Sequence, residues 1–379
     1  MSVLANRRAG TRKGRAARRA APVPVPAALP ALRRAGHGLR EVELALATLP
    51  LLPLWLWNTG TQLAVVAAEA GVPAAPGWRG ALALPDSGAW ALGAVYFAPL
   101  LIAALAACGA VEAGFARARR APMTPGWWLP AWWFALLVPA GVSMPQAAAA
   151  CAFAAVFARG VFGGPGKMLC SQPLLAALVL KVAWPTAMAV VPVGGSLSCP
   201  AALTAWETLA NGGVDAARAA GVSLGGAALG REASAWGATS ALACAAGAGW
   251  LAVRGRLSWR TLAGGIVGVV AMAAGFSAFG PDSAVASVPG SWHLATGALA
   301  FGLAFLATDP DSAPLTRPGR WFLGLAAGGL AVMLRVLDPT HPDGTLEAVL
   351  LASLFAPLVD HAVAWRARRR RARRVERWP

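Results

Sequence analysis

Apolar residues run along most of this chain in stretches long enough to cross a lipid bilayer. A hydrocarbon core of about 30 Å requires roughly 20 apolar residues in a helix. Ten such stretches occur, at 44–67, 89–114, 126–143, 145–162, 173–193, 235–253, 261–280, 292–308, 321–337 and 345–365. This pattern predicts an all-α integral membrane protein of about ten transmembrane helices, with a possible short helix near Ala201–Leu209 in the long segment 194–232.

Basic residues between these stretches predict how the helices are oriented. Lys and Arg of cytoplasmic connections obey the positive-inside rule, and every basic connection falls on the same side as both ends of the chain. Both termini are therefore predicted to be cytoplasmic. Residues 1–40, with ten Lys/Arg and no acid, are predicted to be a disordered basic tail, 41–365 a ten-helix membrane domain, and 366–379, with eight Arg, a second cytoplasmic tail.

Composition narrows the class of protein further. The chain of 379 residues is 57% hydrophobic and 13% charged, which does not describe a soluble surface. Its net charge of +17 resides in the two ends, whereas a nucleic-acid-binding fold would spread Lys and Arg over folded elements. We therefore expect the lipid bilayer as a partner, and no nucleic acid. The five cysteines lie singly, so they are expected to be buried apolar residues rather than metal ligands.

Six short motifs, in order along the chain, resemble those of one family. They are Trp57–Gly60, Val161–Lys167, Ala300–Gly302, Ala307–Ala313, Asp338–Gly344 and Leu354–His361. The chain is similar to the NqrB protein of the sodium-translocating NADH:quinone reductase and to its sister, the RnfD protein of the Rnf electron-transport complex. The resemblance implies the helix bundle of that family, other proteins of an Nqr- or Rnf-like complex as partners, and the bacterial inner membrane as its location.

The flavin attachment motif of this family is altered here. The resemblance implies that FMN is esterified to a threonine in the motif D-G-x-S-G-A-T, whose counterpart is Gly195–Thr204. That stretch keeps Ser198 but places Ala201 where the threonine stands, and alanine has no hydroxyl to esterify. A Gly-Ala-Thr sequence ending at Thr239 lacks the aspartate and serine of the motif, and small residues that pack helices explain it as well. Covalent FMN is therefore not expected.

A glycine-rich loop remains as a candidate site for FMN or riboflavin held non-covalently, or for quinone. Gly163, Gly164 and Gly166 precede Lys167, and backbone N–H groups of such a loop can approach an anionic ligand. The family follows this loop with two asparagines that this chain lacks, although Gln172 substitutes for one if the register slips by a residue. A glycine helix cap followed by a positive-inside lysine is an equal alternative.

Ionisable residues near bilayer depth are candidates for an ion path because burying charge in lipid is costly. Lys181 lies inside one predicted span, and Thr308, Asp309 and Asp311 end another. A lysine that extends toward the interface explains the first, and a solvated helix-end turn explains the others. Arg335 and Glu347 flank an outer turn and are expected to pair across it, and no set of residues predicts a metal site. Tryptophans at span ends are expected as interfacial anchors, at Trp127, Trp128, Trp132, Trp133, Trp292 and Trp321.

Two functions from different classes follow from these observations. The first is a membrane subunit of an Nqr/Rnf-type complex that couples electron transfer, from NADH to quinone or between ferredoxin and NAD, to cation translocation without covalent FMN. The second is a non-redox scaffold or channel-like membrane protein that retains only the fold. A transporter made of two five-helix repeats is compatible with the span count, but the sequence shows no internal repeat.

Overall fold

The structure, a computed structural model, is built almost entirely from helices. It describes residues 28–71, 79, 88–161, 168, 170–191, 199–200, 205–232, 237, 240–281, 283–338 and 344–376. The helices of the first half are α2 (Ala28–Thr48), α3 (Leu51–Ala70), α5 (Ala89–Ala118), α6 (Leu129–Leu137), α7 (Met144–Ala154), the π-helix η1 (Ala155–Gly160), α8 (Gln172–Ala183) and α9 (Pro185–Ala189). Those of the second half are α10 (Ala205–Ala219), α11 (Leu224–Leu229), α12 (Ala241–Val253), α13 (Trp259–Phe279), α14 (Gly290–Ala295), α15 (Leu299–Phe301), the π-helix η2 (Gly302–Leu306), α16 (Arg317–Leu337) and α17 (Thr345–Glu376).

Helix covers the apolar stretches, but several helices are broken. Among the described residues, four helices are long and apolar enough to cross a membrane by themselves, namely Ala89–Ala118, Trp259–Phe279, Arg317–Leu337 and Thr345–Arg370. The predicted span 44–67 is divided between α2 and α3 at Pro50, because proline has no N–H to continue the helical hydrogen bonding. The predicted span 292–308 is composed of three short pieces, α14, α15 and η2. The short helix expected near Ala201–Leu209 appears as the start of α10.

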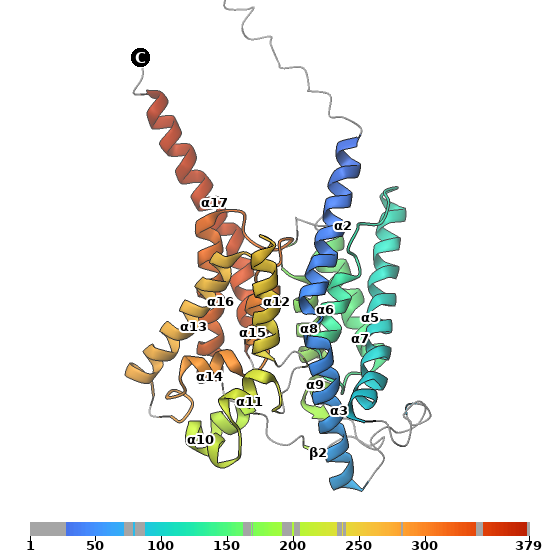
Figure 1. Ribbon diagram of the computed structural model, residues 1–379. Coiled ribbons are helices and arrows are strands. Elements are labelled where there is room, and N and C mark those ends of the chain that lie inside the picture. The colour runs from blue at the N-terminus through green and yellow to red at the C-terminus, as the bar shows by residue number, and fades with distance from the viewer. Residues whose placement is uncertain are drawn as a thin grey trace, which may run out of the picture.

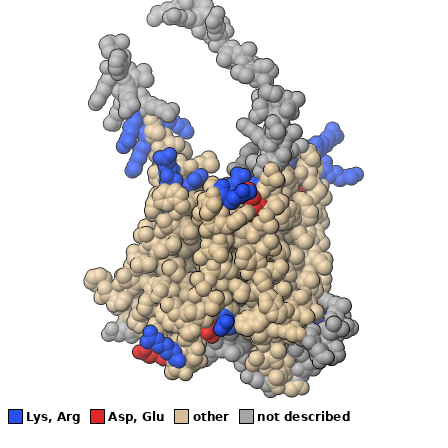
Figure 2. Space-filling view, in the orientation of Figure 1, with Lys and Arg blue, Asp and Glu red and all other residues tan. Residues whose placement is uncertain are grey.

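Positive charge gathers at one end of the molecule. The start of α2 and the end of α17 lie at the same end (Figure 1). Lys and Arg side chains cluster there, and a broad band without charged side chains follows toward the other end (Figure 2). This distribution is the one expected for a protein embedded in a bilayer. Helix α2 begins at Ala28, so helical structure extends back into the segment predicted to be a tail.

Glycines bring α13 and α16 into the closest helix contact of the second half. A Cβ at Gly328 would lie 2.1 Å from the carbonyl oxygen of Gly265, and one at Gly324 would lie 2.0 Å from that of Thr261. Only glycine permits backbones to approach this closely, and small residues are the usual means of packing helices in lipid. Helix α16 packs in turn on α17, so these three helices form one layer.

Burial corrects part of the expectation about tryptophans. Trp133 and Trp292 are buried in the core, 1% and 5% exposed, so they are not lipid-facing anchors, whereas Trp321 is 38% exposed. A span end gives an indole access to the interface only when no neighbouring helix covers it, and the sequence does not show those neighbours.

The cysteines were expected to be buried, and this is confirmed at Cys108, Cys151, Cys170 and Cys244, which are buried and free. Val190–Val191 and Cys199–Pro200 form a two-residue antiparallel pair.

Candidate functional site at the seam between two helix groups

Helices α2–α9 and α10–α17 form two groups that lie side by side (Figure 1). Across the boundary between them, α2 packs on α12 and α8 packs on α17. We call this boundary the seam. Ionisable side chains from both groups are found along it, at the basic end of the molecule and again farther down α8.

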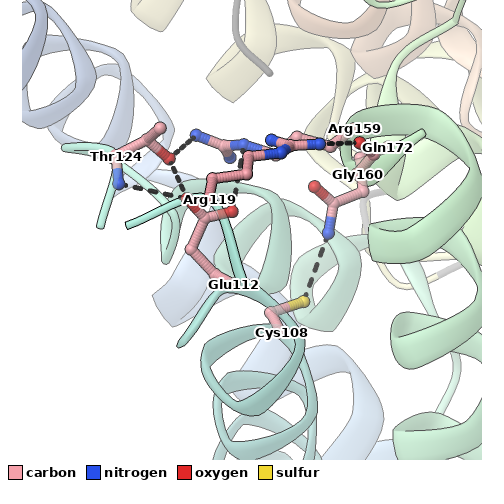
Figure 3. Close-up of polar contacts among 7 residues, drawn as sticks. All are labelled: Cys108, Glu112, Arg119, Thr124, Arg159, Gly160 and Gln172. Carbon is pink, nitrogen blue, oxygen red and sulfur yellow. Dashed lines mark hydrogen bonds and ion pairs between the residues drawn. The ribbon is translucent and has the colours of Figure 1, made fainter. Parts of the chain in front are cut away.

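A buried arginine organises the polar residues at the basic end of the first group. Arg159, only 4% exposed on η1, donates from Nη2 to the Thr124 hydroxyl at 2.7 Å and lies 3.8 Å from a Glu112 carboxylate oxygen. Glu112 also accepts hydrogen bonds from the Thr124 backbone N–H at 3.1 Å and hydroxyl at 2.6 Å. Arg119 donates to the carbonyl of Gly160 beside them (Figure 3). These residues form a closed network, which we call the Arg159 cluster.

Gln172, the first residue of α8, lies beside this cluster, with its side-chain amide directed toward Cys108 (Figure 3). Its Nε2 donates to the Cys108 thiol at 3.3 Å, and its Oε1 is buried without a hydrogen-bond partner in the described structure. A buried amide oxygen that lacks a donor costs free energy comparable to a lost hydrogen bond. This oxygen is therefore ready to accept a hydrogen bond from a water or from a ligand with an N–H or O–H group.

A second polar cluster lies where α2 meets the turn that follows η2. Asp309 is 7% exposed and accepts the Asp311 backbone N–H at 3.1 Å, and Ser171 lies beside its carboxylate. Asp311 forms an ion pair with Arg40 at 3.6 Å, and Glu41 is buried to 7% exposed. We call these five residues the Asp309 cluster. Since Ser171 precedes Gln172, the two clusters adjoin.

Burial raises the pKa of two carboxylates of the Asp309 cluster, those of Glu41 and Asp309. Loss of solvation raises the pKa of Glu41 to about 8, and the charges of Asp311 and Asp309 contribute to the rise, while Arg159 and Arg40 oppose it. Burial also raises the pKa of Asp309, with Asp311 adding to the effect. Both residues lie outside the predicted spans, since Glu41 precedes 44–67 and Asp309 follows 292–308. A proton or another small cation can neutralise such a pair of carboxylates.

A π-helix lies in or next to each cluster. Arg159 lies in η1, and Thr308 and Asp309 come directly after η2, where the Thr308 hydroxyl donates to the carbonyl of Ala304. Short π-helical stretches are rare and are frequently found at functional sites. The presence of a π-helix at each of the two clusters supports a functional role for this part of the seam.

Lys181 forms a separate ion pair across the seam. It lies nine residues after Gln172 on α8, about 13 Å along the helix axis, and pairs with Glu347 near the start of α17. The sequence predicted instead that Glu347 pairs with Arg335. That prediction is wrong: Arg335 is fully buried and donates to the carbonyls of His293 at 2.8 Å and Thr296 at 3.0 Å.

The structure separates the predicted ion-path residues into two places. Thr308, Asp309 and Asp311 lie together after η2, whereas Lys181 lies in the ion pair with Glu347. Helix α8 connects the Asp309 cluster with this ion pair. The solvated turn considered as an alternative for Asp309 is excluded by its burial. The predicted cofactor-site residues lie outside the described residues: Gly163, Gly164, Gly166, Lys167 and Ser198. Ala201, at the position of the family's flavin threonine, and Thr239, at the end of the second Gly-Ala-Thr sequence, also lie outside them. Within the described structure, no three His, Cys, Asp or Glu side chains are grouped to hold a metal ion.

Sequence reasoning missed four charged residues of this site: Arg40, Glu41, Glu112 and Arg159. Glu112 and Arg159 lie inside predicted spans 89–114 and 145–162, so the cost of charge at membrane depth, which selected Lys181, should have selected them too. For Arg40 and Glu41, at the boundary between the predicted tail and the first span, the sequence contains no comparable signal.

Comparison with known proteins identifies the family. Residues 39–368 match the model of the NQR2, RnfD, RnfE family. The chain belongs to this family. Its relatives include proteins named as the B subunit of Na(+)-translocating NADH-quinone reductase. One from Pseudomonas aeruginosa is 36% identical over 84% of this chain and 82% of its own length. Those of Azotobacter vinelandii and Chromohalobacter salexigens are 35% and 34% identical, over 87% and 86% of this chain and 85% and 82% of their own lengths. As a member of the NQR2, RnfD, RnfE family the chain is matched from α2 to α17, so the seam and its clusters lie within the family region.

Proposed function

We propose that this chain is a multi-pass membrane subunit of an Nqr/Rnf-type complex, in which it helps couple electron transfer to cation translocation. The observation that carries the proposal is the family match over residues 39–368, together with relatives whose names describe a Na(+)-translocating NADH-quinone reductase. The matched residues 39–368 include the whole predicted membrane domain, 41–365. The other proteins of such a complex are its partners, and the bacterial inner membrane is its location.

The topology we propose has ten membrane crossings with both termini cytoplasmic. Four helices are long enough to cross by themselves, and the other crossings are made by pairs or groups of shorter helices such as α2 with α3. The basic end of the molecule then faces the cytoplasm (Figure 2). This orientation places the Arg159 and Asp309 clusters near the cytoplasmic surface and the Lys181–Glu347 pair deeper in the bilayer.

Cation movement is proposed to follow the seam. The carboxylates of Glu41 and Asp309 are buried and contributed by both helix groups, which suits them to bind a cation that leaves its hydration shell. From there α8 leads to Lys181 and Glu347, whose ion pair controls passage between the groups. Asp309→Asn is expected to abolish cation uptake by the assembled complex, while Asp215→Asn, on an exposed ion pair of α10, leaves uptake unchanged.

We propose that a redox cofactor, if this protein carries one, is held without a covalent bond. Ala201 replaces the threonine to which the family's FMN is esterified. The described residues that flank the glycine loop in the sequence suit a flavin or quinone: Gln172 presents an unpaired buried amide oxygen, and Arg159 supplies positive charge. A bound flavin supplies one- and two-electron redox chemistry. The role of this chain's residues is to position it, Gln172 by accepting a hydrogen bond and Arg159 by favouring the reduced, anionic form.

Two assays test the cofactor proposal. Ultraviolet fluorescence of the denatured protein, expressed with its flavin transferase, is expected to be dark, and acid extraction of the native protein is expected to release flavin. Gln172→Leu should lower the amount of flavin released. Gln172→Asn, which keeps a side-chain amide and introduces the family's asparagine, should release more flavin than Gln172→Leu. A fluorescent denatured band that disappears in Thr239→Ala would refute the absence of covalent FMN.

A second function is favoured by the altered motifs. Because Ala201 stands where the family has the flavin threonine, and the two asparagines that follow the family's glycine loop are missing here, the chain would serve as a non-redox scaffold or channel-like protein that retains the fold. Absence of flavin in the acid extract, combined with failure to purify with redox proteins, would support this function over the first.

A further inference from the structure

Arginines and exposed tryptophans alternate around the basic end of α13, α16 and α17. We call this the arginine–tryptophan rim, and it contains Arg260, Arg317, Arg320, Arg366 and Arg369 with Trp259, Trp321 and Trp365. Helix α16 lies between the other two helices and packs on both. The rim is therefore one continuous surface formed by three neighbouring helices.

Aromatic contacts order the rim. The rings of Trp259 and Trp321 meet edge to face with centroids 5.9 Å apart, joining α13 to α16. The guanidinium of Arg260 lies 4.6 Å from the centroid of Trp259, and that of Arg369 lies 3.8 Å from Trp365. An arginine stacked on an aromatic ring keeps its N–H donors free at the edge of the plane. These guanidinium groups are thus oriented but still able to bind an anion.

Carboxylates do not neutralise the rim. In the part of the chain that the structure describes, none of its five arginines forms an ion pair. Asp360, the acid nearest along α17, instead accepts hydrogen bonds from the backbone N–H groups of Leu315 and Thr316 and so caps α16. Glu43 is bound to Arg254 and Arg256. The positive charge of the rim therefore remains available.

The same three helices expose apolar side chains between the rim and their opposite ends. These are Ile266, Val267 and Val270 on α13, Phe322 and Leu325 on α16, and Leu354, Phe355 and Leu358 on α17. A surface that is cationic at one end and apolar along its length matches an amphiphile, with an anionic headgroup followed by acyl chains. An acidic soluble protein would match only the charged end.

We propose that the arginine–tryptophan rim binds the phosphate of an anionic phospholipid, whose acyl chains lie on the apolar face of α13, α16 and α17. Arg260 and Arg317 donate hydrogen bonds to the phosphate from the ends of neighbouring helices, Arg369 adds charge above it, and the tryptophans fix the depth of the headgroup. The proposal depends on the membrane location of the chain and not on electron transfer. It therefore stands or fails separately from the proposed function.

The test compares lipid binding by the full-length chain in nanodiscs of phosphatidylcholine with added phosphatidylglycerol, counted by native mass spectrometry. The variant Arg260→Gln/Arg317→Gln/Arg369→Gln removes three rim charges. At about fivefold for each arginine near a membrane surface, it should bind phosphatidylglycerol roughly a hundredfold more weakly. The control Arg117→Gln/Arg120→Gln removes charge from exposed residues at the end of α5 and in the turn that follows it, outside the rim, and should bind nearly as the wild type does.

Several results would overturn the proposal. One is an equal loss of phosphatidylglycerol binding in the rim variant and in the control, because a general attraction of the chain to an anionic bilayer would then explain the binding. Another is displacement of phosphatidylglycerol by millimolar inorganic phosphate, which would mean that the acyl face contributes nothing. Loss of partner proteins without loss of lipid would assign the rim to a protein contact instead. Unchanged gel filtration and tryptophan fluorescence of the variant show that it remains folded.

Discussion

The Arg159 cluster gives the sharpest test of how the first helix group is held together. Arg159→Met leaves the Glu112 carboxylate without its cation, and Glu112→Met leaves a buried guanidinium without its anion. Breaking a buried ion pair by removing one partner costs about 3–5 kcal/mol. Because the Glu112 side chain is 15% exposed, solvent screens part of the interaction, and about 3 kcal/mol is expected for each single change. For a chain of this size, such a loss of stability lowers the unfolding midpoint by about 4 °C.

The double variant Arg159→Met/Glu112→Met separates an ion-pair network from two independent contacts. Replacing both charges by apolar side chains removes the unpaired charge, so its cost should be about that of one single change rather than the sum of two. The measurement is the thermal midpoint of the detergent-solubilised chain, followed by gel filtration after heating. Arg119→Met is the matched control, since Arg119 is exposed, donates to the Gly160 carbonyl and lies over the Phe115 ring, and it should shift the midpoint far less. Additive single effects, within about 0.5 kcal/mol, would refute the coupling.

Three further predictions concern packing, protonation and the seam. Gly328→Ala should sharply reduce the yield of folded protein, because its Cβ would lie 2.1 Å from a carbonyl oxygen. Gly329→Ala should be tolerated, because the nearest atom to its Cβ would be 3.5 Å away. Equal yields of the two variants would contradict the glycine contact between α13 and α16. The pKa of Glu41 is about 8 in the folded chain, above its ordinary 4.5, so the stability that this group contributes is fully present below about pH 4.5 and is lost as pH rises through 8. Thermal midpoints should fall between pH 5 and 9, and Glu41→Gln should flatten that fall; an unchanged slope would exclude Glu41 as its source. Lys181→Glu should lower both stability and cation uptake, and adding Glu347→Lys should restore stability by re-forming the pair in reverse, unless the contact contributes nothing.

The positions of the helices could be predicted because apolar runs and proline are local signals. Helix α5 lies almost where the stretch 89–114 placed it, and α13 and α16 are within a few residues of prediction. The breaks were harder to predict. The apolar run from 126 to 143 predicted one span, but α6 has only nine residues, since packing against neighbours fixes where an apolar segment turns.

The site was only partly predictable because its residues meet across long sequence distances. Asp309 was selected by its charge at a span end, and the structure shows that its side chain is buried, while its role in an ion path stays a prediction. Its neighbour Glu41 is 268 positions earlier in the chain, and no spacing rule connects the two. The pairing of Glu347 failed for the same reason: Arg335 is close in sequence, but Lys181, on a helix of the other group, is the residue that reaches it.

Cation transport by the assembled complex tests the central claim most directly. The chain would be affinity-tagged, purified from native membranes with whatever proteins accompany it, and placed in proteoliposomes, where NADH-driven uptake of radioactive sodium is measured. We predict NADH-dependent uptake that is lost in Asp309→Asn and kept in Asp215→Asn. A preparation that oxidises NADH but takes up cations equally with and without Asp309, or that contains no redox proteins at all, would contradict the account.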